Sequence, residues 1–106
     1  MQSMKELQEK IIQFRDKRNW WQFHTPRNLA ESISIEAAEL LELYQWGRTP
    51  GHEDLRDEIA DIGIYLLTLC NEVGIDLKIA IEIKLEKNGM KYPVDEFYGS
   101  NEKSET

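Results

Sequence analysis

Residues 36–43 (EAAELLEL) and 58–69 (EIADIGIYLLTL) carry acids at i and i+3 inside two apolar helical patterns. On a wheel that advances by about 100° per residue, Glu36 lies near the middle of the apolar stripe that Leu29 and Leu40 define. Solvated acids should avoid such a stripe, because a carboxylate loses its hydration when it is buried. We therefore expect these carboxylates to face the protein interior.

The second pattern has one narrow polar strip on a helix that is otherwise apolar. The strip consists of residues at helical spacing, namely Glu58, Asp61, Tyr65, Thr68 and Glu72. Apolar side chains cover most of the remaining circumference, which predicts burial on nearly every side. A short turn makes consecutive helices antiparallel neighbours, so the two acidic pairs can face each other.

Four inward carboxylates must be protonated, paired with cations or bound to a metal. Between Glu31 and Asp61 there are nine acids but only two bases, Arg48 and Arg56. Ligation by oxygen alone suits a hard cation, Mg²⁺ first and Mn²⁺ as a substitute, whereas zinc prefers nitrogen or sulfur. A di-iron bundle would need Glu-x-x-His, a spacing that neither histidine supplies. Because Mg²⁺ usually works through substrate phosphates, a phosphorylated ligand is expected.

Composition indicates a soluble globular protein of 106 residues, with 41% hydrophobic and 31% charged residues. The formal net charge of −7 argues against DNA or RNA polymers as ligands. Cys70, the only cysteine, can form no internal disulfide and is expected to pack as a small hydrophobe in a reducing compartment. No signal peptide or membrane span is predicted, which favours a cytoplasmic protein.

Helical periodicity and capping residues predict four helices and no strands. The expected ranges are about 4–18, 26–46, 53–74 and 76–88, with Gly47, Gly74 and Gly89 as stops. We expect an all-α, four-helix bundle-like single domain over residues 1–94 and a polar, disordered tail over 95–106. A chain this short would gain from self-association, so a homodimer or a homotetramer built as a dimer of dimers is expected.

Several short motifs occur one after another between Trp20 and Pro93. They are Trp20, Gln22-Phe23-His24, Pro26-Arg27-Asn28-Leu29, Glu36-Ala37-Ala38-Glu39-Leu40, Gln45-Trp46, Glu58-Ile59-Ala60-Asp61-Ile62, Tyr65-Leu66, Lys84, Asn88 and Tyr92-Pro93. In this order and spacing, they resemble the MazG-like all-α nucleoside triphosphate pyrophosphohydrolases, and within that family the dCTP pyrophosphatases.

The resemblance implies a Mg²⁺-dependent enzyme that converts a deoxynucleoside triphosphate, dCTP or a modified dCTP first, to the monophosphate and pyrophosphate. It implies magnesium ligation by Glu36, Glu39, Glu58 and Asp61. Glu39 is our first candidate for the catalytic group that positions or deprotonates the attacking water. Such an enzyme would remove unwanted nucleoside triphosphates (a house-cleaning role) or control the size of the nucleotide pool.

The resemblance also implies the substrate-binding residues. They comprise aromatic walls for the base, a polar group beside them, two residues of the Pro-Arg-Asn motif and contacts to the phosphates: Trp20, Trp46 and Tyr65; His24; Arg27 and Asn28; Lys84, Asn88 and Tyr92. Phe14, Trp21 and Phe23 are assigned to the core instead. Mammalian-type members are more basic just before the Tyr-Pro pair, where this chain has Gly89 and Met90. We therefore expect its binding of the triphosphate or its choice of substrate to differ from theirs.

Two alternatives stay open at this point. The enzyme class can be right with a different substrate, either dUTP or a broad set of canonical and damaged triphosphates. The chain can also be a non-catalytic helical interaction or regulatory module that binds a basic partner. The inward position of Glu36 argues against such a module, because an interface strip should point outward.

Overall fold

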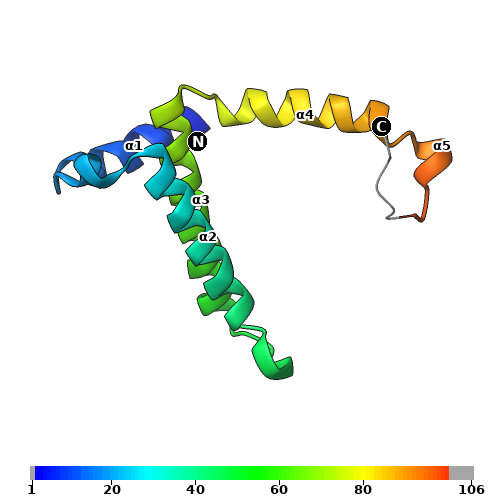
Figure 1. The fold of residues 1–106 in the computed structure, drawn as a ribbon, viewed down its shortest axis with the longest axis horizontal. Helices are drawn as coiled ribbons and strands as arrows, with labels where there is room; N and C mark the ends of the chain where they lie inside the picture. Colours follow the sequence, from blue (N-terminus) through cyan, green and yellow to red (C-terminus); the bar gives the residue numbers. More distant parts are fainter. Residues whose placement is uncertain (1, 101–106) are drawn as a thin grey trace. The chain divides into compact units, whose positions relative to one another are not determined.

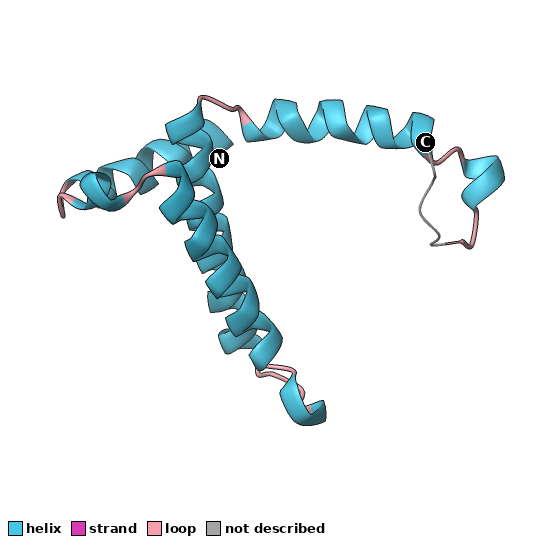
Figure 2. Ribbon diagram, viewed as in Figure 1, coloured by secondary structure: helices cyan, strands magenta, loops and turns pink. Residues whose placement is uncertain are grey.

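The computed structural model describes residues 2–100, and these are helical or irregular with no strand (Figures 1 and 2). The elements are α1 (Met4–Asp16), the 3₁₀ turn η1 (Trp20–Phe23), α2 (Pro26–Glu42), the 3₁₀ turn η2 (Gln45–Gly47), α3 (His52–Val73), α4 (Leu77–Lys91) and α5 (Val94–Phe97). The predicted all-α class is confirmed.

The chain divides into two compact units, residues 1–75 and residues 76–106. In the first unit, α2 packs along α3 as an antiparallel hairpin whose tip carries η2, and α1 also contacts α3 (Figure 1). The contact between α1 and α3 lies toward the end of the hairpin away from η2 (Figure 1). The second unit contains α4 and α5.

Side-chain caps start three of the helices where the sequence predicted them. The Ser3 hydroxyl accepts from the Glu6 N–H at 3.1 Å, and the Thr25 hydroxyl accepts from the Asn28 N–H at 3.1 Å. The Asp76 carboxylate accepts from the Ile79 N–H at 3.0 Å. Each cap satisfies one of the amide groups that a helix N-terminus leaves without an intrahelical partner.

Two helix ends differ from the prediction. The second helix ends at Glu42 rather than Trp46, and the Arg48 guanidinium caps this end by donating to the carbonyls of Glu42 and Gln45, both at 2.9 Å. Gly89 does not stop the fourth helix, which continues to Lys91. The helix ends just before Tyr92-Pro93 instead, because Pro93 disfavours helical backbone in the residue before it.

The predicted polar tail begins inside a short helix. Residues Val94–Phe97 form one helical turn, and the Phe97 ring meets the Tyr92 ring edge to face at 5.0 Å between centroids. This aromatic contact explains local order that the polar composition did not predict. The rest of the predicted tail, residues 101–106, lies outside the described part of the chain.

The core of the described chain is small. Its buried residues are Arg15, Leu29, Leu67, Thr68 and Cys70. Cys70 therefore packs as the sequence predicted.

Several side chains that the sequence assigned to the interior are exposed in the single chain. The largest are Phe14, Trp21, Phe23, Ile59 and Ile64. The assignment of Phe14, Trp21 and Phe23 to the core is thus wrong for one chain, as is the burial of the third helix on nearly every side. The physical reason is that too few helices pack around each one: α2 and α1 contact α3 and leave much of its surface uncovered. Over residues 2–100, no helix combines the length and the apolar character needed to cross a bilayer.

Candidate active site

Three carboxylates from two helices converge in the first unit. Glu36 comes from α2, and Glu58 and Asp61 come from α3; each offers an oxygen within 4.8 Å of the other two. The antiparallel packing of α2 on α3 creates this approach, and the i, i+3 spacing puts Glu58 and Asp61 on one face. Glu39 interacts with Glu36 on the same helix. The structure therefore brings all four acids of the two motifs into one region, with Glu36, Glu58 and Asp61 closest.

The cluster is electrostatically uncompensated within the described chain. One oxygen of Glu36 and one of Glu58, Oε2 in both cases, are buried and have no hydrogen-bond partner among residues 2–100. Burial, followed by hydrogen bonding and charge repulsion from Glu39 and Glu58, raises the pKa of Glu36 to about 7. Like charges this close favour a shared proton or a bound cation.

The donor set of this cluster fits a hard divalent cation. All its ligand atoms are carboxylate oxygens, and two buried oxygens have lone pairs that no donor among residues 2–100 uses. Oxygen-only ligation suits Mg²⁺, Mn²⁺ or Ca²⁺ rather than zinc. Glu36, Glu58 and Asp61 would hold the ion, with Glu39 adjacent.

A cavity of about 290 Å³ opens directly beside the carboxylates. Its lining combines acids of the cluster, aromatic rings, polar groups and aliphatic side chains: Glu36 and Asp61; Phe14, Trp20 and Tyr65; Arg15, His24 and Thr68; Ile11 and Ile64. The lining of a cofactor or ligand site is typically apolar and aromatic with a few polar groups. We name this space the aromatic cavity.

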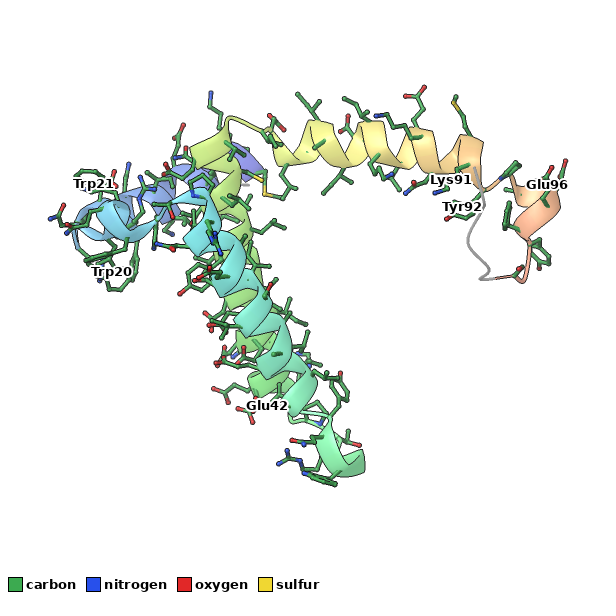
Figure 3. The ribbon with its side chains drawn as sticks, viewed as in Figure 1. Trp20, Trp21, Glu42, Lys91, Tyr92 and Glu96 are labelled. Carbon is green, nitrogen blue, oxygen red and sulfur yellow. The ribbon has the colours of Figure 1, made fainter. Side chains whose placement is uncertain are left out.

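The structure places three of the predicted base-binding residues in the aromatic cavity. Trp20 and Trp21 lie on different sides of the segment between α1 and α2 (Figure 3), and only Trp20 lines the cavity. The His24 ring meets the Tyr65 ring edge to face at 6.5 Å. Burial, with a smaller contribution from the charge of Arg15, lowers the pKa of His24, and its Nδ1 is buried without a partner in the described chain.

Sequence reasoning missed Arg15. This residue is 8% exposed, and its guanidinium forms an ion pair with Glu72 of α3. A signal for it exists in the sequence, because Arg15 falls within about 40° of Ile11 on the apolar stripe of α1. A cation on an apolar stripe requires an anionic partner, and Glu72 lies on the polar strip of α3.

An open groove of about 590 Å³ reaches the carboxylates from another direction. It includes Glu39 and Glu58 and extends to the turn over residues 48–51. Glu42, at the end of α2 (Figure 3), also lines it. Arg48 is the one base among its lining residues, so a polyanion in this groove would need additional positive charge.

The remaining predicted substrate residues are not in the aromatic cavity. Trp46 lies in η2 at the hairpin tip, with a left-handed φ of 65°, and is 86% exposed. Arg27 is exposed and pairs with Glu31, while the Asn28 side chain donates to the Phe23 carbonyl at 3.0 Å. Those two interactions give both residues local structural roles.

Lys84, Asn88 and Tyr92 belong to the second unit. Lys84 and Asn88 are four residues apart on α4, so they share one helix face. Tyr92 follows the helix, with the Lys91 ammonium 5.5 Å from its ring centroid.

Comparisons with known proteins agree with one another. The dCTP pyrophosphatase 1 of Bos taurus is 34% identical over 92% of this chain and 64% of its own length. The dCTP pyrophosphatase 1 of Homo sapiens is 33% identical over 86% of this chain and 59% of its own length. This chain thus spans less than two thirds of the length of these relatives.

A solved structure is also similar. The crystal structure of a pyrophosphatase from Archaeoglobus fulgidus is 47% identical, with a TM-score of 0.77, and the match covers 85% of this chain and 92% of that one. The MazG-like family model matches residues 31–106, a range that contains both carboxylate motifs. The chain therefore belongs to the MazG-like family.

Proposed function

We propose that this chain is a Mg²⁺-dependent nucleoside triphosphate pyrophosphohydrolase. It converts a deoxynucleoside triphosphate, with dCTP or a modified dCTP favoured, to the monophosphate and pyrophosphate. One observation carries the proposal: three carboxylates converge beside an aromatic cavity, and two of them, Glu36 and Glu58, each have a buried oxygen with no partner among residues 2–100. The names of the relatives support the reaction and the base.

The positions of the cavity and the groove support a binding mode. The base stacks between aromatic rings in the cavity, Trp20 and Tyr65 among them. The phosphates cross the carboxylates toward the groove that Glu39 and Arg48 line. Mg²⁺, when bound, would neutralise phosphate oxygens and acidify a water molecule.

We assign the proton transfer to Glu39. Its half-buried carboxylate lines the open groove, where water has access. The carboxylate accepts a proton as the water oxygen bonds to phosphorus and the anhydride bond between the α and β phosphates breaks, so that pyrophosphate leaves. Glu36, Glu58 and Asp61 would hold the ion, and His24 and Tyr65 position the base.

The biological setting follows from this chemistry. Removal of non-canonical or excess deoxynucleoside triphosphates is a task of the cytoplasm, where we place the protein. We propose self-association as a homodimer or homotetramer, and no interaction with nucleic acid polymers or membranes.

The decisive experiment incubates the purified chain with a panel of deoxynucleoside and nucleoside triphosphates, with and without Mg²⁺. Monophosphate and pyrophosphate are quantified by anion-exchange chromatography. We expect Mg²⁺-dependent release of pyrophosphate, fastest with dCTP or a modified dCTP. Preference for dUTP or equal turnover of all bases would keep the enzyme class but change the substrate. No turnover, together with no Mg²⁺ or nucleotide binding by calorimetry, would favour a non-catalytic interaction module.

A further inference from the structure

The polar side chains of the aromatic cavity are the feature that can distinguish one base from another. Aromatic rings stack on any base, so stacking gives affinity with little selectivity. Selection requires hydrogen-bonding groups at fixed positions, and the side chains that line this cavity outside the carboxylate cluster include Arg15, His24 and Thr68.

Arg15 is held rigidly. Its side chain is 10% exposed, its Nε donates to Asp16 at 3.0 Å, and its Nη1 donates to Glu72. Neither Asp16 nor Glu72 is among the residues that line the aromatic cavity. Within residues 2–100, the hydrogen bonds of this guanidinium use Nε and Nη1. The Nη2 donors therefore have no partner in the described chain, and the Arg15 side chain lines the cavity.

The neighbouring polar groups complement this donor. Thr68 is 2% exposed, and its hydroxyl donates its proton to the Ile64 carbonyl at 2.7 Å, so the hydroxyl can offer only lone pairs to a ligand. His24 contributes a buried Nδ1 that has no partner in the described chain. The cavity thus offers one strong cationic donor beside an acceptor, which is the pattern needed to read the edge of a base.

We propose that Arg15 is a specificity-determining residue, whose Nη2 donates to a carbonyl oxygen of the base in the aromatic cavity. This inference rests on the proposed function. Cytosine, uracil, thymine and guanine carry a carbonyl oxygen, whereas adenine has none. The site therefore selects triphosphates of carbonyl-bearing bases and disfavours dATP, and Glu72 positions the guanidinium for this choice.

The test compares kcat/KM for dCTP, dUTP and dATP between the wild type and two variants. The double variant Arg15→Met/Glu72→Leu replaces both members of the ion pair with apolar residues, so that the buried Arg15 position carries no charge and Glu72 does not lose its partner. Arg15→Gln keeps a neutral donor for Glu72. Melting curves and circular dichroism identify which variants are folded, and either folded variant decides the question.

We expect kcat/KM for dCTP and dUTP to fall by about ten- to a hundredfold in a folded variant, and for dATP by less than about threefold, because only the carbonyl bases lose a charge-assisted hydrogen bond. Lys10→Met is the matched control, since it removes one positive charge from an exposed position of the same helix. It should leave all three values unchanged.

An unchanged ratio of dCTP to dATP turnover in a folded variant would overturn the inference, as would an equal fall for all three substrates. Equal turnover of dATP and dCTP by the wild type would also overturn it. Failure of the proposed function is distinguishable from these outcomes, because the wild type would then release no pyrophosphate from any triphosphate.

Discussion

Glu36 is the single residue on which the chemistry of the candidate site depends most. It is half-buried among Glu39 and Glu58, and its Oε2 has no partner in the described chain. An ionised carboxylate in such a place is unfavourable unless a cation compensates it. The same residue therefore controls both the stability of the metal-free chain and its affinity for metal.

The stability of the metal-free protein should fall as pH rises. The pKa of Glu36 is raised from its ordinary value near 4.5 to about 7, so the folded chain binds more protons than the unfolded chain between these values. The free energy of unfolding then decreases with pH across this window. In EDTA, the melting temperature of Glu36→Gln should exceed that of the wild type by a margin that grows from pH 5 to pH 7.

Glu31→Gln is the control for this measurement, because Glu31 is exposed on the same helix. Its melting temperature should track that of the wild type at every pH. A constant difference between Glu36→Gln and the wild type would contradict the assigned pKa.

Loss of one ligand should remove metal binding and activity together. Asp61→Asn withdraws an anionic oxygen from the cluster, so we expect calorimetry to detect no Mg²⁺ binding and pyrophosphate release to fall by more than about a hundredfold. Because the remaining acids repel one another less, the metal-free variant should melt no lower than the wild type.

Asp57→Asn makes the same chemical change on the same helix at a side chain that is 68% exposed. Binding and turnover should remain at wild-type levels in this control. Full activity of Asp61→Asn would eliminate the carboxylate cluster as the metal site.

At the scale of elements, helix caps fix where the site residues stand. Thr25 caps α2 and directly follows His24 in the chain. The residue that fixes where this helix begins therefore also fixes the position of the histidine that lines the cavity. Local capping chemistry thus determines part of the site geometry.

Thr25→Ala should destabilise the protein by about 1 kcal/mol, because the Asn28 N–H loses its acceptor. Urea titration followed by circular dichroism measures this change. Ser34→Ala, an exposed position within the same helix, should change the free energy of unfolding by less than about 0.5 kcal/mol. Equal effects of the two substitutions would show that the cap contributes nothing.

At the scale of the whole molecule, a single chain leaves much apolar surface in contact with solvent. Exposed large apolar side chains occur in the first unit, and on α4 they include Ile79, Ile81, Ile83, Leu85 and Met90. Exposed apolar side chains in such number are typical of association sites. Self-association would cover what the small core of one chain leaves exposed.

Light scattering during size exclusion should give the mass of a dimer or tetramer for the wild type. Ile79→Lys with Ile83→Lys places two charges on one face of α4 and should reduce the mass toward that of a single chain. Glu82→Lys, a change at an already polar exposed position of α4, should retain the wild-type mass. A monomeric wild type would refute self-association.

The sequence by itself determined which segments are helical, which residues cap them and on which face of each helix the acidic side chains lie. These features are local: a wheel places Glu36 on an apolar stripe and gathers Asp61, Tyr65 and Thr68 on one strip, and capping depends on neighbours three residues away. The structure puts these side chains at the carboxylate cluster and the aromatic cavity.

Only the tertiary structure decided which distant residues share the site. Arg15 and Glu72 are 57 residues apart, and their pairing depends on how α1 packs on α3. Trp46 lies outside the aromatic cavity because α2 ends early and η2 stands at the hairpin tip. Periodicity assigns a side chain to a face of its own helix, whereas the packing of helices determines which faces meet.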